Sequence, residues 1–204
     1  MFKKVTSDVL GLSDVGKIIH PSDYDKVDAD DYVMHEDNEK IYFLIKSKAD
    51  EYCFTNKALI HLDGTSAMSK KRLLRRYSYS QNTITHVFLE TAGTVDLDVE
   101  IKFVIGSVNF SIDVNKKQIE ELKDLYKALI KISEICHENE FSLQFSEQSL
   151  NLASATLNRV HSKEENIVEN FQEINERAFK WLQDNREKYH VKDFGFVFEK
   201  FINN

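Results

Sequence analysis

The first residues that could carry chemistry form a row of three carboxylates. Asp96, Asp98 and Glu100 alternate with apolar residues, so they share one face of a strand at steps of roughly 7 Å. Carboxylates this close could hold a divalent cation or raise one another's pKa. A lysine or arginine partner, on a neighbouring strand or on another subunit, is the simpler explanation. The sequence therefore predicts a charged strand face and no metal site.

A cluster of basic residues precedes this row. It consists of Lys70, Lys71, Arg72, Arg75 and Arg76. Apart from Arg75, which lies on the opposite strand face from Arg72 and Arg76, these residues form a candidate anion-binding set, because cations meet phosphate oxygens in such sites. Two alternatives explain the same cluster: a solvated strand edge that resists edge-to-edge pairing, or ion pairs with the acidic segment Asp23–Glu39.

Composition and motifs argue against an enzyme. The net charge is −7, from 27 basic and 34 acidic side chains, which disfavours a general nucleic-acid binder. The seven histidines show no H-x₃-H or HExxH spacing, and no P-loop, G-x-S-x-G or GxGxxG motif occurs. Cys53 and Cys136 lie far apart and form neither a metal spacing nor a disulfide framework. We predict no catalytic residue, no cofactor and no metal.

The sequence also predicts a cytoplasmic location. The N-terminal stretch begins with two lysines but lacks the apolar block of a signal peptide, because Thr6, Ser7 and Asp8 interrupt it. No stretch approaches the ~20 apolar residues that a membrane-spanning helix needs. Cysteines without a disulfide pattern are typical of a reducing compartment.

Alternation of apolar and polar residues indicates strands through most of residues 40–115. The expected strands are residues 41–45, 52–62 (one strand, or two broken near Asn56), 72–79, 84–90, 95–103 and 108–114. Gly106–Ser107 can supply the positive φ of a hairpin turn, and Asp63–Gly64 is a second turn signal. Six or seven consecutive strands without helices between them exclude a parallel sheet. They predict an antiparallel β-sandwich or partly open barrel.

Other segments flank these strands. Residues 2–12 have apolar side chains at helical spacing and predict a short helix packed on its own domain. The acid-rich residues 23–39 lack the calcium-loop pattern and predict a solvated loop of strand-like pieces. Asn115 is expected to begin a helix that ends near Glu138 and caps the barrel, with Gln118 reaching back to the cap.

The C-terminal region, residues 139–204, changes pattern, because apolar residues recur at helical spacing from Glu147 onward. Ser162 could begin a second helix, so the region is either a helical hairpin or one long helix. Its apolar seam consists of Leu150, Leu157, Val160, Ile167, Phe171, Ile174 and Trp181. Since the strands have their own capping helix, the seam is predicted to be a self-association surface. Packing back on the β domain is the alternative.

The last dozen residues return to a strand-like pattern. Their aromatic residues are Phe194, Phe196, Phe198 and Phe201. Side chains this apolar are not expected to stay in water, so they should dock on the helices or on a neighbouring chain.

One motif resembles a known family. The segment TNKALIHLDG and the longer segment KKRLLRRYSYSQNTITHVFLETAGTVDLDVEIKFVIG resemble the bacterial pleckstrin-homology (PH) domain family, in particular its YvbH-like proteins. The strongest motif spans residues 90–100 and includes Thr91, Gly93, Asp96, Asp98 and Glu100. The resemblance implies two packed antiparallel sheets capped by a helix in residues 1–138, a helical oligomerisation region after it, ring-like self-association and no enzymatic activity.

The prediction for function follows from these features. We expect a non-enzymatic, cytoplasmic PH-like module that self-associates into a homo-oligomer and acts as a scaffold or adaptor, with its own copies and another protein as candidate partners. The alternative is a peripheral binder of anionic membrane lipid through the basic strand cluster. The loop Ser47–Glu51 at the position of the phosphoinositide site in eukaryotic PH domains is balanced toward acidic residues, which disfavours headgroup binding there.

Overall fold

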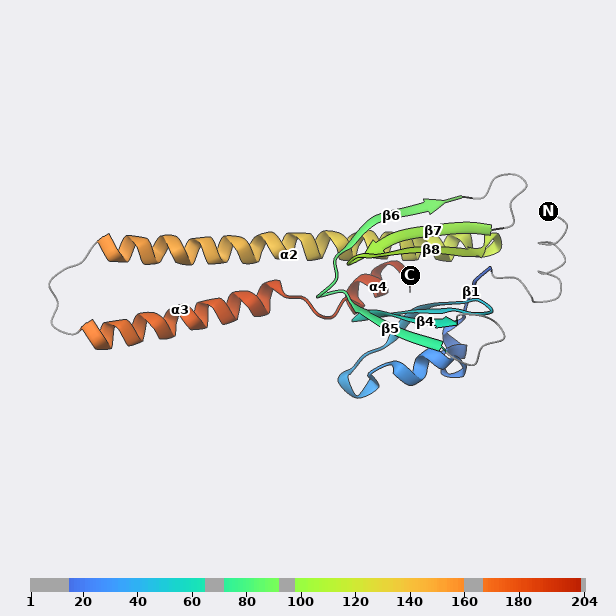
Figure 1. Cartoon of the computed structure of the whole chain (residues 1–204), viewed down its shortest axis with the longest axis horizontal. Coiled ribbons are helices and arrows are strands. Elements are labelled where there is room, and N and C mark those ends of the chain that lie inside the picture. Colours follow the sequence, from blue (N-terminus) through green and yellow to red (C-terminus); the bar gives the residue numbers. More distant parts are fainter. Residues whose placement is uncertain (1–14, 65–71, 92–97, 160–166, 203–204) are drawn as a thin grey trace. The chain divides into compact units, whose positions relative to one another are not determined.

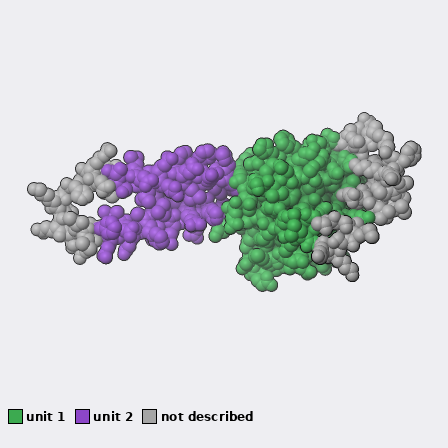
Figure 2. Space-filling model, in the orientation of Figure 1, with its two compact units in different colours: residues 1–134, 192–204 green, residues 135–191 purple. Residues whose placement is uncertain are grey.

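The computed structural model describes residues 15–64, 72–91, 98–159 and 167–202, without the side chains of residues 156–159 and 167–170. The chain divides into two compact units (Figure 2). Unit 1 comprises residues 1–134 and 192–204, and unit 2 comprises residues 135–191. The predicted helix over residues 2–12 lies outside the described residues. Of the helices in the described ranges, none is long and apolar enough to cross a membrane.

Unit 1 contains a five-stranded antiparallel sheet (Figure 1). In sheet order its strands are β1 (Lys17–Ile18), β2 (Ile41–Lys46), β3 (Glu51–Thr55), β4 (Ala58–Gly64) and β5 (Arg72–Ser78). β2 to β5 match the predicted strands, with the break near Asn56 between β3 and β4. The two residues of β1 are too few to show alternation. The predicted turn at Asp63–Gly64 is wrong: both residues belong to β4 and pair with β5.

The second sheet of unit 1 has three antiparallel strands, β6 (Ile84–Glu90), β7 (Asp98–Ile105) and β8 (Val108–Asn115). Burial alternates along β7, where Val99, Ile101 and Phe103 point into the core. Gly106 has a φ of 60°, which confirms the predicted hairpin turn between β7 and β8. The predicted fold class, antiparallel sheets with a helix and further C-terminal helices, is confirmed.

The acid-rich connection is not a solvated loop, contrary to the prediction. It forms three short 3₁₀ helices, η1 (Pro21–Lys26), η2 (Asp28–Tyr32) and η3 (His35–Asp37). Val27, Ala29 and Val33 are buried in one cluster with residues of β2, β3 and β4. The backbone N–H of Ala29 also donates to the buried carboxylate of Glu51 at 2.8 Å. The few apolar residues among the acids therefore fix this segment on the sheet.

The predicted capping helix is present but longer than expected. After the 3₁₀ turn η4 (Lys116–Gln118), α2 runs from Ile119 to Arg159 without interruption, so the predicted end near Glu138 is wrong. No glycine or proline occurs in this stretch to break it. The apolar side chains that α2 buries in unit 1 are Leu122, Leu125, Ala128, Leu129 and Ile132.

The N-terminal cap of this helix also differs in part from the prediction. Asn115 accepts a hydrogen bond from the backbone N–H of Lys117, as expected of a cap. Gln118 does not complete a capping box. Its side chain instead exchanges two hydrogen bonds of 2.9 Å with the backbone of Ile18 in β1. The backbone N–H and carbonyl of Ile18 thus bind this side-chain amide in place of the helix cap.

Two helices follow α2. α3 (Ile167–Tyr189) belongs to unit 2 with the second half of α2, and Figure 1 draws the two antiparallel, as in a helical hairpin. α4 (Gly195–Ile202) belongs to unit 1, although a strand-like pattern was expected and residues 139–204 were assigned to one helical region. Phe194, directly before α4, and Phe198 within it are buried four residues apart and contact Tyr79, with ring centroids 5.9 and 6.2 Å away. This helical spacing brings α4 back to the β domain.

Candidate interaction surface

Unit 2 exposes a broad apolar arc on α3. Phe171, Ile174 and Trp181 of the predicted seam are 68%, 49% and 46% exposed. Phe179 and Leu182 are also exposed and were not part of the predicted seam. With 3.6 residues per turn, these five side chains fall within an arc of roughly 160°. So wide an arc of large side chains in water is unfavourable for an isolated helix.

A second exposed apolar group lies on α2. Phe141, Phe145 and Leu152 are all exposed, Leu152 by 71%, and their spacing of four and seven residues puts them on one face. Leu143 and Leu150 lie on the opposite face, where they are half-buried. The helix therefore carries apolar residues on two faces. The predicted seam included Leu150 but none of the three exposed residues on the other face of α2.

Unit 2 shows no buried apolar core among residues 135–155 and 171–191, the part whose side chains are described. Within the described part of residues 135–191, the only buried residue is Ser146, and each apolar side chain keeps measurable contact with solvent. In unit 1, by contrast, the two sheets, α2 and α4 enclose a fully buried core. The remaining members of the predicted seam cannot be assessed: the side chains of Leu157 and Ile167, and the whole of Val160, lie outside the described residues.

The three arginines of the basic cluster lie on the edge strand β5, where each pairs with a carboxylate. Arg72 binds Asp28 of η2 and lies 3.6 Å from the buried Glu51 of β3. Arg75 points to the other face and binds Asp63 of β4 at 2.6 Å. Arg72 therefore pairs with the acidic segment Asp23–Glu39, whereas Arg75 pairs with the neighbouring strand.

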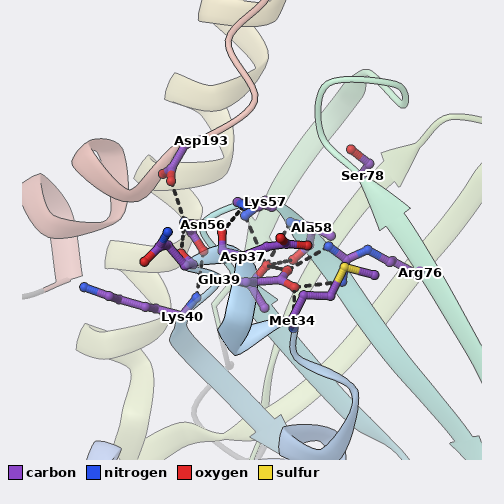
Figure 3. A network of polar contacts seen from close by, with 12 residues as sticks. Met34, Asp37, Glu39, Lys40, Asn56, Lys57, Ala58, Arg76, Ser78 and Asp193 are labelled. Carbon is purple, nitrogen blue, oxygen red and sulfur yellow. Dashed lines mark hydrogen bonds and ion pairs between the residues drawn. The ribbon is translucent and has the colours of Figure 1, made fainter.

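Arg76 makes the most buried of these contacts. Its guanidinium donates two hydrogen bonds, of 2.9 and 3.1 Å, to the carboxylate of Glu39 (Figure 3). Glu39 is buried and also accepts from the hydroxyl of Thr55 and the backbone N–H of Met34. Burial alone would raise the pKa of Glu39, but these donors together hold it below its ordinary value.

These pairs match the ion-pair alternative for the basic cluster. Arg72 and Arg76, two of the four candidate anion-binding residues, are held by carboxylates of the acidic segment. Lys70 and Lys71 lie outside the described residues. The described part of this cluster is therefore occupied with internal charge pairing.

A polar clasp that the sequence did not reveal joins the C-terminal segment to the β3–β4 turn. Asn56 donates to the carboxylate of Asp193 at 2.6 Å, and its backbone carbonyl accepts from the N–H of Phe194 at 2.7 Å (Figure 3). The same amide side chain accepts from the backbone N–H of Lys40. Partners 137 residues apart leave no local signal in a sequence.

The family motif lies around the start of β7. Thr91 is exposed just after β6, Gly93 and Asp96 lie outside the described residues, and Asp98 begins β7. Glu100 accepts a hydrogen bond from the hydroxyl of Ser111 and lies 3.0 Å from the ammonium of Lys102. The Ser111 hydrogen bond, followed by Lys102, holds the pKa of Glu100 below its ordinary value.

The partner of this carboxylate is therefore a lysine, as the sequence suggested, but it lies on the same strand. Lys102 also binds Glu90 of β6 at 2.7 Å and so links two strands. Across the described ranges, no group of three histidine, cysteine or acidic side chains could hold a metal ion.

The cysteines do not resemble catalytic nucleophiles. Cys53 is buried in β3, and burial, with nearby carboxylates, raises the pKa of its thiol. Burial also raises the pKa of Cys136, on α2, to about 11. Because the thiolate is the nucleophile, both thiols are poorly reactive at neutral pH.

Comparisons with known proteins agree with this architecture. A family model described as "Bacterial PH domain" matches residues 9–133, and one described as "YvbH-like oligomerisation region" matches residues 144–204. The protein YvbH of Bacillus subtilis (strain 168) is 63% identical over 204 residues, which cover 100% of both chains. A crystal structure of a PH-domain-containing protein from Exiguobacterium sibiricum 255-15 is 54% identical. It superposes with a TM-score of 0.87 and covers 93% of this chain and 100% of that one. The chain therefore belongs to the bacterial PH domain family and carries a YvbH-like oligomerisation region after its PH domain.

Proposed function

We propose that this protein self-associates through the apolar surface of unit 2 and works as a non-enzymatic scaffold or adaptor. The association surface comprises the exposed apolar side chains of α3 (Phe171, Ile174, Phe179, Trp181 and Leu182) and the second exposed face of α2 (Phe141, Phe145 and Leu152). Copies of the chain would then present several PH-like domains on one assembly.

The observation that carries the proposal is that the described side chains of unit 2 form no buried apolar core. Two helices whose large apolar side chains remain exposed gain little stability from packing on each other. Burial of such side chains yields about 1.5–3 kcal/mol each. Covering these side chains between copies of the chain opposes the entropy lost on association. The family description of residues 144–204 as an oligomerisation region supports the same conclusion.

Size-exclusion chromatography with light scattering on the full-length protein tests this proposal. The wild-type protein should elute as a homo-oligomer at micromolar concentration. Phe171→Asp should weaken association roughly 100-fold or more, because a charge in an apolar interface costs several kcal/mol.

Gln183→Asp is the matched control. It adds the same charge to an exposed position of the same helix but outside the apolar arc, so the oligomer should persist. A monomeric wild-type protein at micromolar concentration would refute the proposal. An oligomer that survives Phe171→Asp would show that this surface is not the interface.

The proposal also addresses catalysis, cellular location and lipid binding. The bacterial PH domain family is not an enzyme family, and we assign no catalytic role. We place the assembly in the cytoplasm, consistent with two free cysteines. Binding of anionic lipid through β5 is not part of the proposal, because Arg72 and Arg76 already pair with carboxylates.

A further inference from the structure

A pocket of about 550 Å³ lies beside β1 in unit 1, and no residue of β5 lines it. β1 closes unit 1 between its two sheets, because it pairs with β2 while the adjacent Gly16 exchanges backbone hydrogen bonds with Asp113 and Asn115 at the end of β8. Residues of β1, η1, β2 and η4 line the pocket. Its charged lining residues are Lys17, His20, Asp23, Lys26, Lys46 and Lys117.

This lining is basic, although the chain as a whole has a net charge of −7. Four lysines face one carboxylate. Lys26 pairs with that carboxylate, Asp23, at 2.6 Å, and Lys46 pairs with the buried Glu51 at 2.5 Å. Lys17 and Lys117 have no carboxylate within ion-pair distance among residues 15–64, 72–91, 98–159 and 167–202. Within the described part of the chain, these two ammonium groups are therefore available to an anion.

The fold fixes these two lysines near each other. They adjoin Ile18 and Gln118, whose two reciprocal hydrogen bonds of 2.9 Å tie β1 to the beginning of the capping helix. Lys17 also lies directly opposite Lys46 in the β1–β2 pair. Like charges placed directly opposite on paired strands are destabilising unless something compensates them, and here Glu51 compensates the charge of Lys46.

One further lining group favours a negative ligand at this place. His20 supplies a further ring nitrogen on the rim. Ammonium groups are established binders of phosphate oxygens.

We propose that this pocket binds a phosphate-bearing ligand with at least two negative charges, and that Lys17 and Lys117 are its principal contacts. The group could be carried by a free metabolite or by a lipid headgroup. The two sources share the same chemistry at the pocket.

Isothermal titration of the full-length protein with sodium pyrophosphate tests the proposal. Wild-type protein should show saturable binding of one pyrophosphate per chain. In Lys17→Gln/Lys117→Gln the affinity should fall about 25-fold, since each surface ion pair contributes about fivefold. Both side chains are exposed, so the double variant should unfold at the same temperature as the wild type.

Lys180→Gln, which removes one exposed charge from α3, is the control and should bind pyrophosphate like the wild type. Absence of saturable binding to the wild type at millimolar pyrophosphate would overturn the proposal. An equal loss of affinity in Lys180→Gln and the double variant would also overturn it, because the effect would then follow net charge.

Co-sedimentation with phosphatidylcholine vesicles, with and without phosphatidic acid, distinguishes the two sources. Pyrophosphate binding together with lysine-dependent binding to phosphatidic acid supports a headgroup. Pyrophosphate binding without vesicle binding supports a free phosphorylated ligand. Vesicle binding that the double variant retains, with no pyrophosphate binding, rejects the pocket as the site.

Discussion

Replacing Arg76 by methionine should destabilise unit 1 by about 3 kcal/mol at neutral pH. The change leaves the carboxylate of Glu39, which is 1% exposed, without its guanidinium partner. Removing one partner of a buried ion pair costs about 3–5 kcal/mol. The lower end applies here, because the Arg76 side chain is 29% exposed and the hydroxyl of Thr55 and the N–H of Met34 still donate to Glu39.

The pH dependence of this loss gives a stricter test. In the wild-type protein the folded-state pKa of Glu39 is lowered, so its contribution is present above the unfolded pKa and is lost as the pH falls through the folded value. Without Arg76, burial should dominate and raise the folded-state pKa. The carboxyl group of the variant then takes up a proton more easily when folded. The difference in unfolding free energy between variant and wild type should therefore shrink between pH 7 and about pH 5.

Urea-induced unfolding of the full-length protein, followed by far-ultraviolet circular dichroism at one protein concentration, measures both effects. Arg75→Met is the matched control, since it makes the same substitution at the preceding residue but breaks a partly exposed pair with Asp63. That variant should change stability little and should show no shrinking difference on acidification. If Arg75→Met and Arg76→Met lose similar stability, the buried pair does not have the assigned role.

Two further predictions concern buried groups of unit 1 and of α2. Phe198→Ala should lower the unfolding free energy by about 3–5 kcal/mol in the same urea assay, because its fully buried ring stacks on Tyr42. Phe196→Ala, at an exposed position of the same helix, should have little effect, and an equal loss in both would contradict the docking of α4. Iodoacetamide should modify Cys136 at a rate that still rises above about pH 10, because its pKa is raised to about 11, and should leave Cys53 unmodified in the folded protein. Peptide mass spectrometry measures both rates, and a plateau for Cys136 at about pH 10, as for an exposed thiol, would contradict the burial of its thiol.

The sequence was most informative where local period determines structure. Alternation along β7 and β8 and the glycine at position 106 predicted the hairpin correctly, because each residue's orientation depends on its immediate neighbours. The same reasoning located the capping helix. It placed the end of that helix wrongly, because the change of pattern near Glu138 marks the passage from unit 1 to unit 2 and not a break in the backbone.

Features that depend on distant partners could not be predicted in this way. The acidic segment was expected to be solvated, because most of its residues are charged. The burial of Ala29 and Val33 depends on contacts with β2, β3 and β4, which the local sequence does not show. The amide of Gln118 has a local option and a distant one, and only the fold shows that Ile18 is within reach. Likewise, the second apolar face of α2 was missed because one seam already explained most of the apolar residues.

The return of α4 to the PH-like domain has a consequence for synthesis on the ribosome. Residues 194–202 are translated after the whole of unit 2, yet Phe194 and Phe198 complete the core of a domain whose strands emerged much earlier. At about 5–20 residues per second, the nascent domain waits several seconds with the aromatic faces of Tyr42 and Tyr79 uncovered. During this time the helices of unit 2, with their exposed apolar side chains, leave the exit tunnel. Under the proposed self-association, neighbouring nascent chains on one messenger would meet through these helices before either PH-like domain is finished.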